Sequence, residues 1–253
     1  MDIYKGFAAM YDELMNDIPY QKWGDYIFER IKQRCPNTKK PLVLDLACGT
    51  GNMTIFLSKK GFDMIGVDLS IDMLAAAQQK AYGAKQKILF LAQDMRELDL
   101  YGTIDAAVSV CDGLNYILKP DELRTVFERV RLFLNPGGVF IFDMNTEYKF
   151  KELLAQRSFE AETGNIICEW DNSYDEITKI NEYRVCFFTN QLVKESDQLN
   201  CEKFMEVHKQ RAYYTGDVVQ MLKNCGFGNV DVYHEYTDEP PRPDSARVTF
   251  VAE

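Results

Sequence analysis

Three carboxylates stand at or just beyond the ends of apolar segments of strand length. Asp45 lies near the end of "PLVLDLA", Asp68 ends "FDMIGVD", and Asp94 follows shortly after "KILFLA". Because a parallel α/β sheet binds its ligands beyond the carboxyl ends of its strands, these acids should line one edge of a single crevice. Such an edge suits a ligand that carries a ribose and a positive charge, and it would repel a diphosphate.

Each acid has an expected partner in such a ligand. A carboxylate at the tip of the second strand can accept hydrogen bonds from both ribose hydroxyls, which is the role expected for Asp68. Asp45 would suit an α-ammonium group, and Asp94 with the Met95 backbone could bind the edge of an adenine. Asp68 also has a purely structural interpretation, as an acid at the start of the helix that Ser70 caps.

A glycine turn follows the first of these strands. Gly49 and Gly51 let the backbone approach a ligand, and a helix beginning at Asn52 turns its N–H groups toward an anion. In the dinucleotide-binding pattern G-x-G-x-x-G, Thr54 would occupy the third glycine position. The turn alone does not separate a dinucleotide from another ligand, but Thr54 and Asp45 argue against a nicotinamide cofactor.

Apolar segments alternate with helical patterns through the first 145 residues. The best helical pattern spans 121–134, whose apolar residues share one face before the "NPGG" turn. This alternation predicts an α/β fold with a doubly wound sheet. Five near-continuous apolar runs predict strands buried on both faces, at 41–47, 62–68, 87–92, 104–110 and 137–143.

The pattern changes after residue 145. Three strand-like runs separated by polar turns predict an antiparallel meander inserted into the α/β core. A helix over 215–227 and two last strands, in "NVDVYHEY" and "ARVTFVA", return the chain to the core. We therefore expect a core made of residues 1–145 and 211–253, with an N-terminal helical cap, and an inserted antiparallel lid at 146–210.

Composition narrows the function. The 253 residues include 29 basic and 39 acidic ones, and the net charge of −10 makes a nucleic-acid partner unlikely. Seven cysteines without a CxxC pair and only two histidines predict reduced thiols in a cytoplasmic protein and no metal site. We expect no membrane segment, since no run approaches about 18 apolar residues, and no signal peptide.

Four motifs occur in a characteristic order: "LDLACGTG", "VDLS" followed by "DML", "QDM", and "LNPGGVFIFD". Over about 40–145 the chain thereby resembles the class I S-adenosyl-L-methionine-dependent methyltransferases. Its N-terminal segment and meander look like a bacterial subgroup of small-molecule methyltransferases, and remotely like glycine N-methyltransferase. The resemblance implies a seven-stranded, mostly parallel, Rossmann-like sheet with an inserted small antiparallel sheet. It also implies S-adenosyl-L-methionine as methyl donor, released as S-adenosyl-L-homocysteine.

The resemblance also assigns residues to the cofactor. Ala47 stands where many members of the family carry glycine, and we expect the substitution to be tolerated. Cys111 would lie at the tip of the fourth strand, although cysteines there are more often packing residues than nucleophiles. Trp23 can equally be a helix-packing aromatic. The expected cofactor-binding residues are Tyr4, Trp23, Asp45, Ala47, Gly49, Gly51, Asp68, Leu69, Met73, Asp94, Met95 and Cys111.

Methyl transfer is an in-line displacement, so the protein must hold the nucleophile, exclude water and accept a proton where the nucleophile carries one. The candidates for this work are Tyr11, Asp112, His208 and Arg211. His208 can titrate near neutrality and Arg211 can bind a carboxylate through two hydrogen bonds. A histidine on a strand is also commonly an ordinary hydrogen-bonded residue. The tip "CDGLNY" lacks the [ND]-P-P-[YF] motif of amino-group DNA methyltransferases, which favours a small-molecule acceptor.

The meander leaves the core after the fifth strand, so it should start on the ligand side of the sheet and cover the acceptor. Its aromatic side chains could wall an apolar pocket, with Arg184, His208 and Arg211 as polar anchors. It could instead be a dimer interface, and the chain is expected to be a monomer or a homodimer. Two other functions stay open, a non-catalytic S-adenosyl-L-methionine sensor and a nicotinamide oxidoreductase. The aromatic residues are Trp170, Tyr174, Tyr183, Phe187, Phe188 and Phe204.

Overall fold

The computed structural model describes residues 11–12, 15, 17–163, 166–191 and 200–253. A seven-stranded sheet has the strand order β10-β11-β5-β4-β1-β2-β3, in which β11 is antiparallel to both of its neighbours and the other pairs are parallel. The predicted doubly wound, mostly parallel sheet is therefore confirmed. Its strands are β1 (Leu42–Leu46), β2 (Asp63–Asp68), β3 (Leu89–Ala92), β4 (Ile104–Ser109), β5 (Leu134–Asn145), β10 (Val230–His234) and β11 (Arg247–Ala252).

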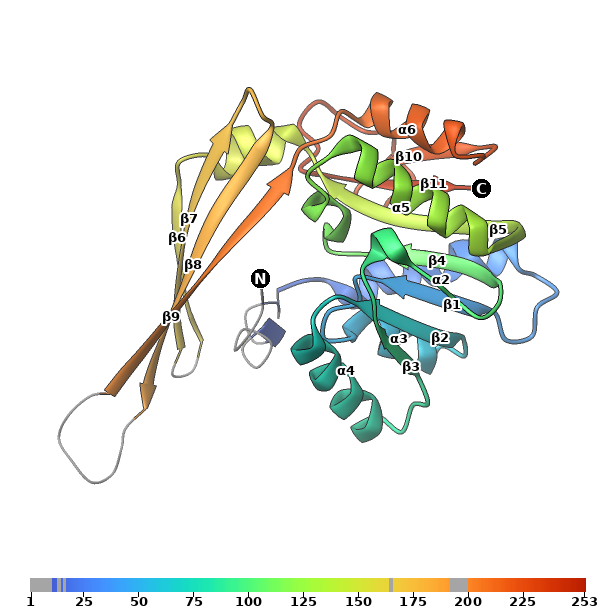
Figure 1. The fold of residues 1–253 in the computed structure, drawn as a ribbon, viewed down its shortest axis with the longest axis horizontal. Helices are drawn as coiled ribbons and strands as arrows, with labels where there is room; N and C mark the ends of the chain where they lie inside the picture. Colours follow the sequence, from blue (N-terminus) through green and yellow to red (C-terminus); the bar gives the residue numbers. More distant parts are fainter. Residues whose placement is uncertain (1–10, 13–14, 16, 164–165, 192–199) are drawn as a thin grey trace.

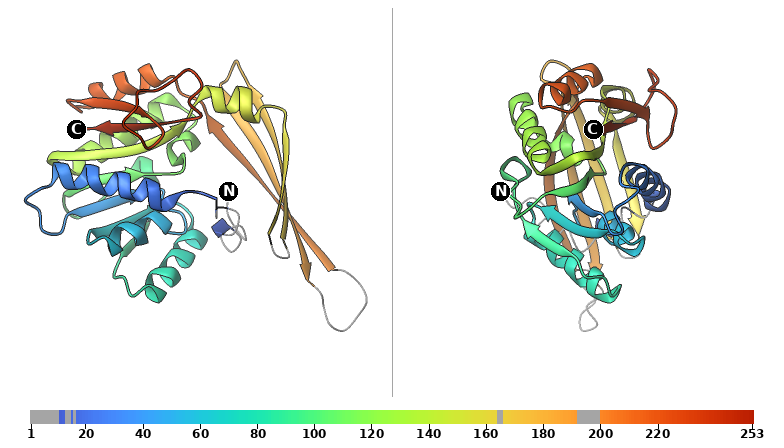
Figure 2. Two further views of the ribbon diagram at one scale, coloured as in Figure 1. Left: turned by 180° about the vertical axis from the view of Figure 1, so that it is seen from behind. Right: turned by 90° about the vertical axis from the view of Figure 1, so that its right-hand side faces the viewer.

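Helices cover both faces of this sheet (Figures 1 and 2). One face carries α5 and α6, and the other carries α2 and α3. None of the helices in the described part of the chain is long and apolar enough to cross a membrane. The helices are α2 (Tyr20–Arg34), α3 (Asn52–Lys59), α4 (Ile71–Gly83), α5 (Pro120–Phe133) and α6 (Thr215–Asn224), with the 3-10 turns η1 (Met95–Glu97) and η2 (Gly113–Tyr116) and a π-helix, η3 (Lys149–Leu154).

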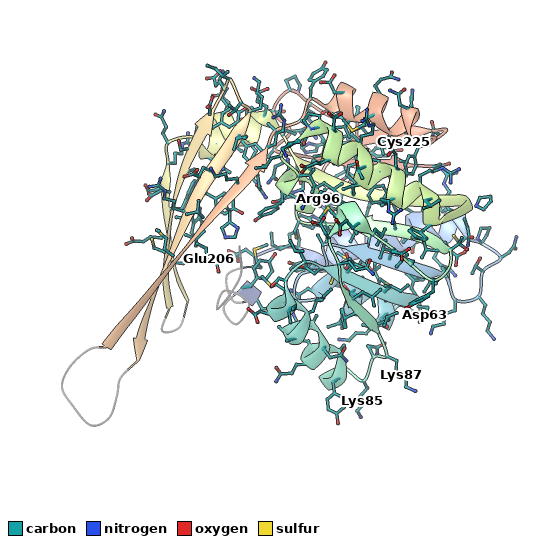
Figure 3. The ribbon with its side chains drawn as sticks, viewed as in Figure 1. Asp63, Lys85, Lys87, Arg96, Glu206 and Cys225 are labelled. Carbon is teal, nitrogen blue, oxygen red and sulfur yellow. The ribbon has the colours of Figure 1, made fainter. Side chains whose placement is uncertain are left out.

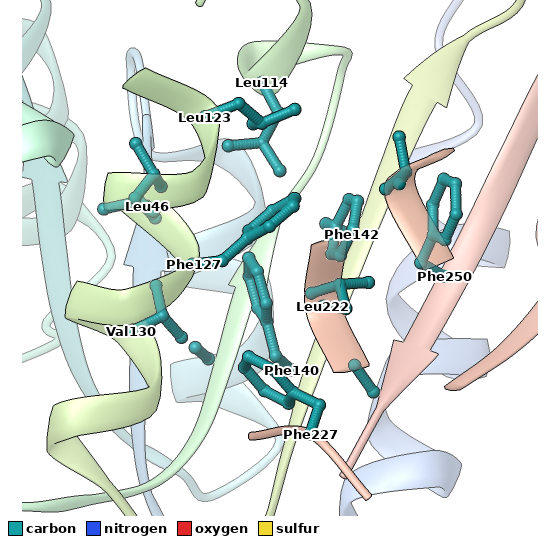
Figure 4. Close-up of a cluster of buried hydrophobic side chains, with 14 of the residues drawn as sticks. Leu46, Leu114, Leu123, Phe127, Val130, Phe140, Phe142, Leu222, Phe227 and Phe250 are labelled. Carbon is teal, nitrogen blue, oxygen red and sulfur yellow. The ribbon is translucent and has the colours of Figure 1, made fainter. Parts of the chain in front are cut away.

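Helix α5 shows how the sequence pattern becomes packing. Its predicted apolar face is fully buried, and Phe127 lies against Phe140 and Phe142 of β5 (Figure 4). Leu222 of α6 and Phe250 of β11 complete the same cluster. Burying each such side chain contributes roughly 1.5–3 kcal/mol. This core packs against β4 and β5 and thereby positions their carboxyl ends.

A separate four-stranded antiparallel sheet, in the order β6-β7-β8-β9, stands at the edge where the parallel strands end (Figure 1). Three of its strands match the predicted meander, and β6 is an addition. The segment "SFEAET" of β6 mixes charged and apolar residues and carried no clear strand signal. The strands are β6 (Ser158–Thr163), β7 (Ile166–Asp175), β8 (Ile180–Gln191) and β9 (Asn200–Arg211).

The two faces of this second sheet differ. Asn181, Val185 and His208 are buried on the face toward the core, whereas Arg184 and Lys209 are exposed on the opposite face. Since side chains alternate along a strand, this division follows from the register. Arg184 pairs with Glu182 on the exposed face, so the prediction of Arg184 as an anchor toward the acceptor is wrong.

Candidate active site

The loop after β1 is built from left-handed residues. Ala47, Gly49 and Gly51 have φ of 60°, 53° and 76°. A Cβ on Gly51 would lie 3.0 Å from the Cβ of Ala77 in α4, so the helix packs directly on this glycine. A Cβ on Gly49 would meet no described atom within 4 Å, which leaves room for a ligand above the loop. Ala47 occupies a left-handed position that costs a non-glycine residue roughly 1–2 kcal/mol, and its tolerance there stays a prediction.

Asp68 joins this loop to α4. Its carboxylate accepts hydrogen bonds from the Gly49 N–H at 2.7 Å and the Ser70 N–H at 2.8 Å. Burial raises the pKa of Asp68. Ser70 caps α4 as predicted, accepting from the Met73 N–H. Leu69 next to the acid is 70% exposed, so an apolar side chain is offered beside a hydrogen-bond acceptor. This pairing fits a purine nucleoside.

Asp45 lies beneath the loop rather than on it. Its side chain is 0% exposed and accepts a hydrogen bond from Thr54 Oγ1 at 2.6 Å. Thr54, which replaces the third glycine of the dinucleotide pattern, thus holds the acid in place. Burial, together with the nearby charge of Asp68, raises the pKa of Asp45 to about 7. In this conformation Asp45 shapes the loop and offers no surface to an ammonium group.

Asp94 starts the turn that carries Met95. Its carboxylate accepts a hydrogen bond from Arg96 Nε at 2.9 Å. Arg96, which is labelled in Figure 3, also binds Glu122 of α5 at 2.9 Å. The hydrogen bonds from Arg96 lower the pKa of Asp94. Asp94 is therefore an ionised acceptor at the carboxyl end of β3, one strand away from Asp68.

The tip of β4 is strained and is held by an acid of the neighbouring strand. Cys111 and Asp112 both have left-handed backbones, with φ of 58° and 56°. Their N–H groups donate to the two oxygens of Asp143, at 2.9 and 2.8 Å. Asp143 also accepts from Tyr236 and from Arg247, and Arg247 reaches Asp112 at 2.7 Å. Strain of this kind concentrates at functional sites, where the surrounding structure must impose it.

Two of the predicted cofactor residues are packing residues here. Trp23 is 7% exposed, stacks on Tyr236 with ring centroids 4.6 Å apart, and lies 5.2 Å from the Arg247 guanidinium. Met73 is 2% exposed on the buried side of α4. Both side chains are buried and so are not exposed to a ligand. Sequence alone did not distinguish the two cases, because an apolar residue near a site can be a core residue or a ligand contact.

Asp12 binds the glycine loop and the start of α3. Asp12 accepts hydrogen bonds from Thr50 Oγ1 at 2.6 Å, from Asn52 at 2.9 Å and from Lys80 at 2.6 Å. Tyr11 precedes this anchor, so it stands close to the loop, whereas the predicted Tyr4 lies outside the described residues.

The second sheet reaches the β4 tip through β9. Gln210 Nε2 donates to Asp112 Oδ2 at 2.5 Å, and Asn115 donates to the backbone carbonyl of Arg211 at 2.8 Å. The Arg211 guanidinium donates to the carbonyl of Leu118 at 3.3 Å, which makes it a junction residue. The contacts of Arg211 differ from those of His208, and the roles of these two residues as polar anchors toward the acceptor stay predictions.

His208 belongs to a buried cluster with two tyrosines and a glutamate. Its ring is 1% exposed and stacks on Tyr183 at 4.8 Å. Nδ1 lies 3.3 Å from the hydroxyl of Tyr116, which is 2.5 Å from the hydroxyl of Tyr183. Nε2 lies 3.2 Å from a carboxylate oxygen of Glu206, labelled on β9 in Figure 3. A Glu–His–Tyr line thus runs from the sheet to the loop after β4.

Sequence reasoning missed Asp143, Arg247, Tyr116 and Glu206. Only Asp143 had a signal, as the acid that ends "FIFD". The side chains of Phe187, Phe188 and Phe204 lie outside the described part, whereas Trp170 stacks on Phe159 within the second sheet. No group of three histidine, cysteine or acidic residues that could hold a metal ion occurs among the described residues.

Comparison with known proteins agrees with this geometry. A family model described as a methyltransferase domain matches residues 43–138. A Bacillus subtilis (strain 168) protein named "Putative methyltransferase YqeM" is 36% identical over 99% of this chain and 97% of its own length. A crystal structure of an S-adenosylmethionine-dependent methyltransferase from Clostridium acetobutylicum is 31% identical, with a TM-score of 0.85, over 99% of this chain and 98% of that one.

A more distant structure shares the fold alone. The SAM-bound amino pentose methyltransferase CalS10 from Micromonospora echinaspora is 16% identical, with a TM-score of 0.74, over 98% of this chain and 96% of that one. The near-complete coverage by relatives above 30% identity shows the family. The chain belongs to the class I S-adenosyl-L-methionine-dependent methyltransferases.

Proposed function

We propose that this enzyme methylates a small polar molecule held between the tip of β4 and the inner face of the four-stranded sheet. The methyl donor is S-adenosyl-L-methionine, which supplies an electrophilic methyl group on sulfur. The observation that carries the proposal is the meeting of Asp112 and Tyr116, after β4, with Gln210 and His208 of β9. Two polar surfaces from different sheets converge where the fold places its ligands.

The residues around the glycine loop fit the cofactor. Gly49 leaves open space, Asp68 keeps lone pairs beyond its two backbone hydrogen bonds, and Leu69 offers apolar surface. We propose that Asp68 binds the ribose hydroxyls, and that Asp94 with Met95 binds the adenine. Asp45 and Ala47 act indirectly, by holding the loop, and Cys111 fixes the floor beside the methyl-transfer position.

The tyrosine cluster fits the remaining chemical need, which is to accept a proton. Tyr116 extends from the loop that follows β4, and its hydroxyl is linked through His208 to Glu206. His208 is too buried to touch an acceptor itself, so in this proposal it positions Tyr116 and receives the proton from it. Tyr183 holds the same hydroxyl from β8.

In this proposal the second sheet is the lid over the acceptor. The predicted division of the chain into a core, 1–145 and 211–253, and an inserted lid, 146–210, is part of the same proposal. Its buried polar face toward the core supports a lid, because a surface built only for dimer contact would not place Asn181 and His208 there. The six cysteines in the described part are free thiols, which supports a cytoplasmic enzyme.

The test is a methyl-transfer assay with a metabolite library, scored by formation of S-adenosyl-L-homocysteine, on the full-length protein. With an acceptor found, Tyr116→Phe and His208→Gln should lower kcat by about tenfold or more and leave cofactor affinity unchanged. Arg184→Gln, on the exposed face of the same sheet, is the matched control and should keep full turnover. Cofactor binding without any product would favour a sensor, and tighter binding of NAD than of S-adenosyl-L-homocysteine would contradict the proposal.

A further inference from the structure

Lys149 places a partly buried ammonium group beside the β4 tip. It begins the π-helix η3, four residues after the end of β5, and π-helical turns are frequent at functional sites. Its Nζ donates to Asn145 Oδ1 at 2.9 Å. Among the described residues this is the polar contact of the group, and no carboxylate of that part of the chain forms an ion pair with it. An ammonium has three N–H donors, so the protein uses one of them.

The nearby acids are already committed to other partners. Asp143 binds the N–H groups of Cys111 and Asp112 and the side chains of Tyr236 and Arg247. The two oxygens of Asp112 are bound by Arg247 and Gln210. Arg247 contacts both carboxylates directly and compensates one of their two negative charges, whereas Lys149 makes no direct contact with either of them.

Lys149 is thus a cation that no described carboxylate contacts directly. Burial lowers the pKa of Lys149, and the charge of Arg247 lowers it further, while Asp112 and Asp143 oppose the shift from a distance. A partly buried charge in this situation gains strongly from an anionic partner, because its desolvation has already taken place. A ligand can also reach Lys149, since this residue is only partly buried.

We infer that Lys149 binds a carboxylate group of the methyl acceptor, and that the acceptor is an organic acid with one negative charge at that position. A phosphate dianion fits less well, because it would carry a second charge into the vicinity of Asp112 and Asp143. The inference rests on the proposed function only for placing the acceptor at the β4 tip.

The inference can be tested before the acceptor is known, with acetate as the probe. Full-length protein labelled with 13Cε-lysine is titrated with acetate, and separately with inorganic phosphate, at constant ionic strength, with and without S-adenosyl-L-homocysteine. The Lys149 signal is assigned by its loss in Lys149→Met. We expect a saturable shift of this signal with acetate and weaker binding of phosphate.

Variants give a second measurement. Acetate binding followed by thermal stabilisation should weaken by about tenfold or more in Lys149→Met, which corresponds to roughly 1.4 kcal/mol, and should persist in Lys149→Arg. Lys151→Met removes the same charge from the same turn, where Lys151 is exposed and pairs with Glu176 at 2.8 Å, and should bind acetate like the wild type.

Three results would overturn the inference: no saturable shift at Lys149, tighter binding of phosphate than of acetate, or equal acetate binding by wild type and Lys149→Met. Failure of the proposed function has a different signature. Calorimetry would then show no binding of S-adenosyl-L-homocysteine, while the acetate titration without that compound would still report on Lys149.

Discussion

Asp143 and Arg247 form an ion pair in the interior of the protein, where Asp143 is 0% and Arg247 is 7% exposed. The pair connects β5 to the antiparallel β11 and then reaches the tip of β4 through Asp112. Burying such a pair is costly, and an apolar pair of similar volume would often be as stable. The role of the pair here is to orient the loop after β4, because the Asp143 carboxylate accepts hydrogen bonds from two successive N–H groups of that strained loop.

Replacing Arg247 by methionine should therefore lower the free energy of unfolding by about 3–5 kcal/mol, since the buried Asp143 and the partly buried Asp112 lose their counter-ion. Urea unfolding measures the loss. Adding Asp143→Asn to this variant should recover part of the stability, because one of the stranded charges is removed. Arg242→Met, which breaks the exposed pair with Glu239, is the control and should change little. A loss no larger than that of the control would show that the buried pair carries no stability.

The loops after β1 and β4 touch at Ala47 and Gly113. A Cβ on Gly113 would lie 2.9 Å from the Cβ of Ala47 and 3.2 Å from Ser109 Oγ. Ala47→Gly should raise the free energy of unfolding by about 1 kcal/mol, because it removes the left-handed strain of an alanine at φ 60°. Gly113→Ala should be destabilising in the wild type and less so in the Ala47→Gly background. Additive effects in this double-mutant cycle would contradict the contact.

The parts that were predictable from sequence are those with a local signature. The parallel strands are apolar runs, α5 repeats its apolar residues along one face, and Asp68 and Asp94 follow their strands directly. The buried network could not be predicted, because Asp143 and Arg247 are 104 residues apart and meet only through the pairing of β5 with β11. His208 and Tyr116, 92 residues apart, meet only because β9 reaches the tip of β4.

Residue type also misled in specific ways. Arg211 has the chemistry to bind a carboxylate, and one N–H of its guanidinium donates to the carbonyl of Leu118, a contact that the sequence did not indicate. Trp23 has the surface to stack on a ligand, but it stacks on Tyr236. The kinds of contact that a side chain can make are predictable from its residue type. The partner that it contacts depends on which elements the fold places next to it. The free donors of Lys149 could be recognised only after the partners of its neighbours were known.

Asp68 and Asp72 both lie at the start of α4, so comparing their substitutions distinguishes a role in cofactor binding from a role at the helix start. Asp68→Ala should weaken binding of S-adenosyl-L-homocysteine by roughly 2–4 kcal/mol, since hydrogen bonds to the ribose and the hold on the Gly49 N–H are lost together. Asp72, an exposed acid in the first turn of α4, should have little effect when replaced by alanine. Calorimetry measures both. Equal losses would mean that Asp68 acts only at the start of the helix.

Asp45 gives a pH dependence whose sign can be worked out. Its folded pKa is raised from 3.8 to about 7 by burial and by Asp68. Between these values the folded protein holds a proton that the unfolded chain releases, so stability is lost as the pH rises toward 7. From pH 5.5 to 8 the contribution amounts to about 1.5 pH units, or about 2 kcal/mol.

Asp45→Asn should remove this pH-dependent contribution to stability. The amide oxygen can still accept a hydrogen bond from the Thr54 hydroxyl, and the amide does not titrate in this range. Urea unfolding of wild type and variant at pH 5.5 and pH 8 isolates it. We expect the variant to gain about 2 kcal/mol on the wild type between the two pH values. Asp63→Asn, at the exposed start of β2, is the control for removing one negative charge. Parallel pH profiles for the wild type and Asp45→Asn would show that the buried carboxyl does not hold a proton in the folded protein.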